Sequence, residues 1–341
     1  MPHPHRMAHA LGSATLALCL MGTAAAQLLP SHLPHGYTSV PFPEENPYSQ
    51  AKAELGKLLF FDGRLSPKGI SCATCHDPAR GFAGNVALNT GASGKLEPRH
   101  TPTILNRAWG HSQLWDGRLP TLEAQIDNAV SQPDEMGSSP QEVERALHAI
   151  PGYAPFFERA YGDAAVRYDR VAMAIATYER TLVSANSAYD RYLAGDKSAL
   201  TKSQKAGLEF FNHKGECAEC HSGANLTDER YSNTGVGFDN RQPDAGRKTV
   251  TGRKSDNGRF KTPTLRDVAR RGPYMHDGSL KTLDEVLEFY AKGGVMNQQL
   301  DMRITRFYMD ERTKRDLHSF LDAFNGELPP DAATPPSQLP Q

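Results

Sequence analysis

The apolar residues of this chain recur at helical spacing in several segments. In residues 283–291 the apolar positions lie three or four apart and include Tyr290. Thr282 and Glu285 provide a capping box at the start of this predicted helix. A longer apolar-rich stretch, residues 169–183, predicts a helix that bridges two domains. No segment predicts a convincing β-hairpin, so we expect a mainly α-helical fold with long loops.

The chain also repeats itself at a long and constant interval. Three short motifs return 161 residues later: Thr101-Pro-Thr103 as Thr262-Pro-Thr264, Trp115-Asp-Gly117 as His276-Asp-Gly278, and Leu119-Pro-Thr-Leu122 as Leu280-Lys-Thr-Leu283. A period of this length indicates duplicated domains rather than a solenoid. The length of 341 residues also favours two domains.

Composition and charge exclude some classes of function. The 38 basic and 39 acidic residues leave a formal charge of −1, so no basic field predicts nucleic-acid binding. Only 38% of residues are hydrophobic, which suggests that a prosthetic group fills part of the core. Arg6, a short apolar run and the small residues 24–26 predict a signal peptide at 1–26 and export to the periplasm. That run is too short to span a membrane.

Four of the five cysteines lie in two copies of one motif. Cys72-Ala-Thr-Cys75-His76 recurs as Cys217-Ala-Glu-Cys220-His221. Two disulfides or a zinc ribbon could also use four cysteines, but neither needs the paired histidines. A Cys-x-x-Cys-His motif is typical of covalent haem c, with two thioethers and the histidine as iron ligand. We therefore predict two covalently bound haem c groups, with His76 and His221 as iron ligands.

Together these patterns predict two cytochrome c-like domains, each wrapped on a covalent haem and related by internal duplication. The predicted order is a signal peptide at 1–26, an N-terminal extension at 27–47, an N-terminal cytochrome c domain at 48–165, an interdomain helix at 166–200, a C-terminal cytochrome c domain at 201–328, and a disordered, proline-rich tail at 329–341.

The sixth coordination position decides what each haem can do. The residue that matches Tyr290 at the 161-residue offset is Ala129, which cannot bind iron. Glu135, in the loop beyond it, could move a proton to and from a bound peroxide, although such a loop is more often a solvated turn. On spacing alone Tyr290 is better explained as a core residue. Trp115 is either a packing residue or an aromatic bridge between the haems.

These motifs resemble the bacterial di-haem cytochrome c peroxidases and their relative MauG, which oxidises tryptophans of a partner protein. The resemblance covers roughly residues 48–325 and includes, in family order, CATCH, TPTILN, LWDGR, LEAQ, DEMG, CAECHSG, TPTLR, PYMHDGSL and FYAKGG. It implies that His76 is the proximal ligand of the peroxide-binding haem and His221 that of the electron-transfer haem. It further implies roles for five other residues: Gln125 and Glu135 in the distal pocket, Trp115 between the haems, His276 close to the second haem, and Tyr290 as the MauG-like axial ligand of that haem.

Two departures from the family pattern change what the resemblance implies. Many members have a histidine after the first haem motif that blocks the resting iron, but residues 83–97 contain none. We therefore predict an open first haem, as in MauG. The family binds calcium between its domains, and the matching positions here are His100, Arg271 and Pro273. Calcium is possible, although histidine is a poor ligand for this hard cation.

Three functions remain open at this point. The first is a periplasmic peroxidase that reduces hydrogen peroxide with electrons from a small c-type cytochrome or another redox protein. The second is a MauG-like enzyme that spends peroxide-derived oxidising equivalents on Trp or Tyr of a protein substrate. The third is a non-enzymatic di-haem electron carrier. A monomer and a homodimer are equally compatible with the sequence, and we expect neither a nucleic-acid partner nor a membrane span.

Overall fold

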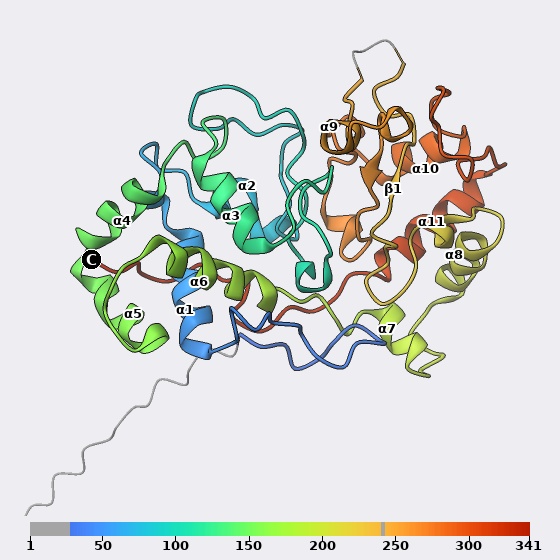
Figure 1. Cartoon of the computed structure of the whole chain (residues 1–341). Helices are drawn as coiled ribbons and strands as arrows, with labels where there is room; N and C mark the ends of the chain where they lie inside the picture. The colour runs from blue at the N-terminus through green and yellow to red at the C-terminus, as the bar shows by residue number, and fades with distance from the viewer. Residues whose placement is uncertain (1–27, 240–242) are drawn as a thin grey trace, which may run out of the picture.

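The computed structural model describes residues 28–239 and 243–341, so the predicted signal peptide at 1–26 lies outside the described residues. The fold is mainly helical, as predicted, and Figure 1 shows its helices gathered in two lobes. The elements are α1 (Gln50–Phe61), α2 (Cys72–Cys75), α3 (Leu122–Ser131), α4 (Pro140–His148), α5 (Ala154–Tyr161), α6 (Tyr168–Thr181), α7 (Ala188–Leu193), α8 (Lys202–Asn212), β1 (Tyr231–Ser232), α9 (Lys248–Thr251), β2 (Phe260–Lys261), α10 (Leu283–Ala291) and α11 (Glu311–Asp322).

The core of the first lobe forms where α1 packs closely against α6. A Cβ atom on Gly56 would lie 1.9 Å from the carbonyl oxygen of Ala174, so only glycine allows this approach. Buried residues of α3, α4 and α5 complete the same hydrophobic cluster. The predicted interdomain helix therefore differs from the observed one: α6 belongs to the first core and ends at Thr181. Residues 182–187 make the crossing, and α7 packs on the second core.

The second lobe repeats this arrangement with α8 and α11. A Cβ atom on Gly207 would lie 2.2 Å from the carbonyl oxygen of Asp316, which again requires glycine at the crossing. Phe320 and Phe324 fill the centre of this core. The capping box predicted at Thr282 is formed at the start of α10, and another at Thr201 begins α8. An antiparallel pair of two-residue strands, β1 and β2, is the sheet in the described part of the chain.

The two lobes share unusual backbone conformations at the 161-residue offset. Asn106 and Asp267 both have positive φ before a short 3₁₀ turn, and Leu114 and Met275 both have positive φ directly before the motifs Trp115-Asp-Gly117 and His276-Asp-Gly278. Each of these turns is closed by an isolated bridge at the matching position: Gln113 with Leu119, and Tyr274 with Leu280. Non-glycine residues rarely adopt positive φ, so the match reflects a shared local structure.

Both ends of the described chain are packed against the lobes. Contrary to the expectation of a disordered tail, residues 329–341 return to the first lobe, where the C-terminus lies in Figure 1. Ala332 is fully buried and its carbonyl accepts a hydrogen bond from the Tyr178 hydroxyl (2.5 Å). At the other end, Tyr37 stacks on Trp109 with ring centroids 4.3 Å apart. These contacts bury apolar area that proline-rich composition alone does not predict.

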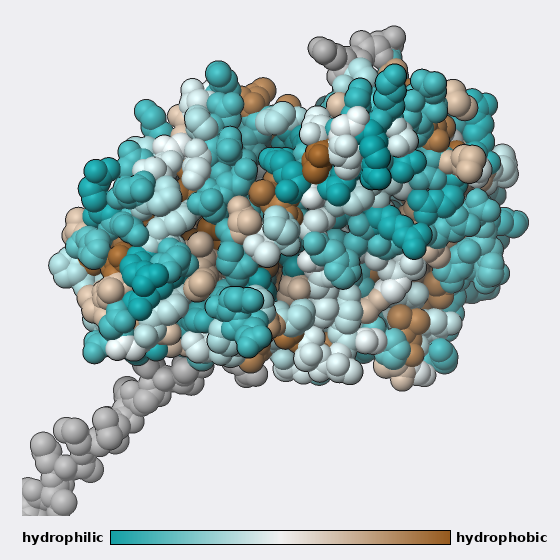
Figure 2. Space-filling view, in the orientation of Figure 1, coloured by the Kyte–Doolittle hydropathy of each residue, from teal (hydrophilic) through white to brown (hydrophobic). Residues whose placement is uncertain are grey.

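The surface shown in Figure 2 is mostly hydrophilic, with apolar residues scattered over both lobes. Within the described residues, no helix is long and apolar enough to cross a membrane.

Candidate active site

The first Cys-x-x-Cys-His motif forms a single helical turn. Cys72 and Cys75 begin and end α2, and the backbone N–H of His76 donates to the Cys72 carbonyl (2.9 Å). Nδ1 of His76 lies 3.0 Å from the carbonyl oxygen of Phe82. Because a carbonyl only accepts, Nδ1 carries the proton and Nε2 keeps the lone pair that iron binding requires. Burial lowers the pKa of His76 to about 4, which keeps this imidazole neutral.

The second motif adopts the same arrangement in the other lobe. The N–H of His221 donates to the Cys217 carbonyl (2.9 Å), and Nδ1 of His221 lies 3.3 Å from the carbonyl oxygen of Leu226. Burial also lowers the pKa of His221. Cys72, Cys75, Cys217 and Cys220 form no disulfide in the structure. The described residues also contain no group of three or more His, Cys, Asp or Glu that could hold a metal ion.

A cavity of about 650 Å³ adjoins the first motif. A water molecule occupies about 30 Å³, so the cavity suits a prosthetic group rather than a few waters. Its wall contains both cysteines and the histidine of the first motif. Three other predicted residues, Trp115, Gln125 and Glu135, also line it, and so does Ala129. The neutral His76, the two free thiols and the apolar wall therefore fit a covalently held haem.

Glu135 is the best-placed acid–base group in this cavity. Its side chain accepts a hydrogen bond from Asn128 Nδ2 at 3.2 Å. Burial raises the pKa of Glu135, while the Arg118 guanidinium and the Asn128 amide oppose this rise. Arg118 itself pairs with the buried carboxylate of Asp116 at 3.0 Å. A half-buried carboxyl with a raised pKa holds a proton more readily than a solvated glutamate, which suits it to proton exchange with a bound substrate.

Two further carboxyl groups, which no sequence motif predicts, also line the cavity. Glu97 approaches the Cys75 sulfur at 4.0 Å, and burial together with Glu135 raises its pKa to about 7. Glu179 is 3% exposed, its Oε2 has no hydrogen-bond partner, and burial raises its pKa to about 8. Glu97 ends the segment 83–97, which follows the first motif and carries no motif of its own. Glu179 belongs to α6, and the sequence did not predict which face of this helix would line the cavity.

Trp115 stands at the junction of the two lobes. Its indole Nε1 donates to the His100 carbonyl (2.7 Å), and its ring meets His276 edge-on with centroids 6.4 Å apart. Phe260 stacks on the other side of His276, with centroids 3.7 Å apart. Trp115 and His276, which the family resemblance implies lie between and beside the haems, are thus in contact. Phe260 extends this aromatic series, although no sequence pattern singles it out.

Tyr290 lies in the second lobe, away from the cavity. It is half-buried on α10, and its pKa is raised by burial and then by the nearby thiols of Cys220 and Cys217. Two methionines that follow it in the sequence are exposed. Met296 is 81% exposed and Met302 is 94% exposed. The structure therefore places Tyr290 near the second pair of cysteines, whereas Ala129 occupies the equivalent helix at the first pair.

Comparisons with known proteins agree with this geometry. Residues 50–198 match the family model described as di-haem cytochrome c peroxidase. The methylamine utilization protein MauG of Methylorubrum extorquens is 43% identical over 309 residues, 89% of this chain and 85% of that protein. The chain belongs to the di-haem cytochrome c peroxidase and MauG family.

Other relatives are named either as cytochrome c peroxidases or as MauG-like proteins. Cytochrome c551 peroxidase of Pseudomonas aeruginosa is 38% identical over 306 residues, 85% of this chain and 84% of that protein. Among solved structures, a MauG-like protein associated with microbial copper homeostasis superposes with a TM-score of 0.81 and 30% identity, covering 90% of this chain and 97% of that one. The chain is thus a di-haem oxidoreductase of the peroxidase type, and its family uses two haem groups.

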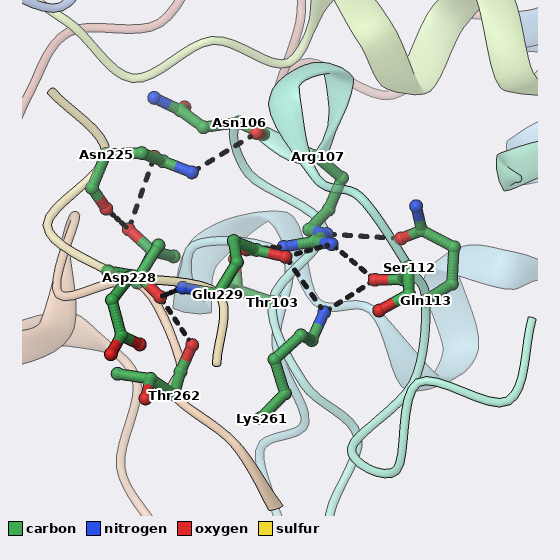
Figure 3. Close-up of polar contacts among 12 residues, drawn as sticks. Thr103, Asn106, Arg107, Ser112, Gln113, Asn225, Asp228, Glu229, Lys261 and Thr262 are labelled. Atoms are coloured by element: carbon green, nitrogen blue, oxygen red, sulfur yellow. Dashed lines mark hydrogen bonds and ion pairs between the residues drawn. The ribbon is translucent and has the colours of Figure 1, made fainter. Parts of the chain in front are cut away.

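The lobes of this family member are joined by a buried charged cluster, drawn in Figure 3. Arg107 from the first lobe pairs with Glu229 of the second at 2.6 Å. Lys261 donates to the Ser112 carbonyl (2.8 Å) and approaches Glu229 at 3.7 Å. Burial and the neighbouring Arg107 lower the pKa of Lys261 to about 7. Because Arg107 and Lys261 also line the cavity, the cluster fixes one wall of it.

The residues predicted for calcium are only partly suited to it. The imidazole Nδ1 of His100 lies within 3.1 Å of the carbonyls of Val86 and Ala87, so this side chain is already engaged. The buried guanidinium of Arg271 donates to the Thr264 carbonyl (2.6 Å) and places a positive charge close by. Calcium at His100, Arg271 and Pro273 stays a prediction, and any such ion would depend on backbone carbonyls.

Proposed function

We propose that this protein is a periplasmic peroxidase with two covalently attached haem c groups, one in each of two duplicated lobes. Hydrogen peroxide would be reduced in the first lobe with electrons passed through the second from a c-type cytochrome. The observation that supports this proposal best is the composition of the large cavity. It combines the first Cys-x-x-Cys-His motif with Gln125 and Glu135, and offers Ala129 where the second lobe has Tyr290.

When bound, the haem of the first lobe would supply an iron centre at which the O–O bond of peroxide can be reduced. Glu135 would take a proton from the incoming peroxide and return it to the leaving oxygen, so that water departs. The hydrogen bond from Asn128 orients this carboxyl. Gln125, one of the cavity residues, would donate its amide hydrogen to the peroxide and hold it in place.

Electron supply would use the junction of the lobes. The His276 ring contacts both Trp115, which lines the cavity, and Phe260. We infer that Trp115 couples the two redox sites and that a reduced donor docks on the second lobe. The N-terminal segment 1–26 would act as the export signal that delivers the chain to the periplasm.

A second candidate function follows from Tyr290. A phenolate ligand stabilises the oxidised states of iron and lowers the potential of the second haem, which makes it a poorer acceptor from ordinary cytochromes. Together with the 43% identity to MauG, this favours oxidation of Trp or Tyr side chains on a partner protein. A pure electron carrier is less favoured because it would leave Gln125 and Glu135 without a role.

Two measurements on the purified holoprotein separate these functions. One high-spin and one low-spin haem in the ferric spectrum are expected, and two low-spin haems would contradict an open first site. Steady-state turnover of reduced cytochrome c with peroxide tests the peroxidase proposal directly. If turnover is negligible in the wild type but rises sharply in Tyr290→Met, the MauG-like function is supported instead. Calcium is checked by metal analysis of the same preparation.

A further inference from the structure

A second hollow, of about 420 Å³, lies on the C-terminal lobe and is separate from the large cavity. It opens beside β1 and α9. Its wall is dominated by guanidinium groups, which come from residues far apart in the sequence: Arg230, Arg247, Arg253, Arg259 and Arg303. None of these residues carries a motif of the peroxidase family, and the proposed peroxide chemistry does not use them.

The acidic residues of the hollow do not balance its charge. Asp256 pairs with Arg253 at 2.9 Å and approaches Arg259 at 3.8 Å. Asp301 pairs with Arg303 at 2.9 Å. Five arginines line the hollow with two aspartates, and the carboxylate of Asp228 lies beside Arg303, which leaves an excess of two positive charges around one concave surface. Like charges gathered in this way repel one another, so an anion in the hollow would stabilise the arrangement.

Several of the donors are fixed in place but not fully used. Nη1 of Arg247 donates to the carbonyls of Asp116 (2.7 Å) and Gly117 (2.9 Å), and its guanidinium lies over the Tyr231 ring at 4.3 Å. Nε of Arg259 is buried and has no hydrogen-bond partner. Arg230 is exposed and has no side-chain ion pair in the described part of the protein. A buried donor without a partner is uncommon in a folded protein, so Nε of Arg259 suggests a missing acceptor.

We propose that this hollow is a binding site for a phosphate group, either free phosphate or a small phosphate monoester. A phosphate carries up to two negative charges and several acceptor oxygens, which match the excess charge and the fork-shaped donors of arginine. The hollow is several times larger than one phosphate, so it also accommodates the organic part of an ester. A single carboxylate would satisfy fewer of the guanidinium groups.

The location of the site connects it with the second redox centre. Arg303 approaches the Asp228 carboxylate at 3.7 Å, and the backbone N–H of Asp228 donates to the Cys220 carbonyl (2.8 Å). Phosphate bound to Arg303 would therefore change the charge close to the second Cys-x-x-Cys-His motif. The binding itself does not depend on the proposed peroxidase function and can be measured without turnover.

The test is calorimetric titration of the full-length holoprotein with inorganic phosphate at low ionic strength, with potassium chloride at equal ionic strength as the blank. A parallel titration with glycerol phosphate distinguishes the two sources, since tighter binding of the ester assigns the site to monoesters. Wild type should show one saturable site. Arg230→Gln and Arg259→Gln should each weaken binding by about tenfold or more, the value of one lost charge-assisted hydrogen bond.

Arg312→Gln is the matched control, because Arg312 is 77% exposed on α11 and lies outside the hollow. It should leave phosphate affinity unchanged. Equal heats with phosphate and chloride, or unchanged affinity in both hollow variants, would overturn the proposal. If Arg259→Gln fails to fold, Arg230→Gln decides alone, because the exposed Arg230 supports no ion pair. Variants that bind no less phosphate but slow turnover with an acidic donor protein would assign the hollow to protein docking instead.

Discussion

Replacing Glu135 with glutamine removes the carboxyl group that we propose moves a proton during peroxide reduction. Glutamine has the same size, and its amide oxygen can still accept the 3.2 Å hydrogen bond from Asn128. The local structure and the cavity should therefore persist. General acid–base catalysis contributes about 10²–10⁴-fold, or about 3–5 kcal/mol of activation free energy. We expect the reaction with hydrogen peroxide to slow by about 10²-fold or more.

The assay is stopped-flow mixing of the ferric holoprotein with one equivalent of peroxide, followed through the haem absorption spectrum. The wild-type rate should rise with pH through the raised pKa of Glu135, since only the ionised carboxylate can accept a proton. The variant should lose this dependence. Glu158→Gln, an exposed position on α5, is the control for loss of a carboxylate. A Glu135→Gln protein with both haems bound and a rate within about threefold of wild type would refute the reasoning.

Three other substitutions test separate parts of the structure. Tyr290→Phe should change the ferric spectrum of the second haem while the first still reacts with peroxide; an unchanged spectrum would remove Tyr290 from the iron. Glu179→Gln tests a carboxyl whose pKa is raised from 4.5 to about 8 by burial. A raised folded-state pKa means that its stabilising contribution is complete below about 4.5 and is lost as pH rises through about 8. The melting temperature of Glu179→Gln should therefore rise relative to that of wild type as the pH increases from about 5 to about 9. A difference between the two melting temperatures that does not change with pH would contradict the burial argument. Glu229→Gln leaves the buried guanidinium of Arg107 without its carboxylate and should lower the free energy of unfolding by about 3–5 kcal/mol in denaturant titrations. The exposed control Glu209→Gln should change it by less than about 0.5 kcal/mol, and equal effects would show that the cluster does not hold the lobes together.

Much of the candidate site could be predicted because its geometry is local in the sequence. The turn from Cys72 to His76 closes through one backbone hydrogen bond, so five consecutive residues define it. The capping box at Thr282 joins residues three apart, and the sequence predicts it correctly. The repeat at 161 residues likewise identifies Ala129 as the counterpart of Tyr290. A constant offset needs no knowledge of how the two copies pack.

The sequence alone therefore determined the helical class and the family, and it predicts the residues that would hold each haem. Only the tertiary structure decided which side chains share one cavity. Glu97 and Glu179 join it from a loop and a helix that carry no motif, and their pKa values depend on burial that packing creates. The contact of Phe260 with His276, the return of the C-terminal tail and the hollow lined by arginines have the same origin. Each joins residues far apart along the chain, and the packing of the helices, rather than any local pattern, brings them together.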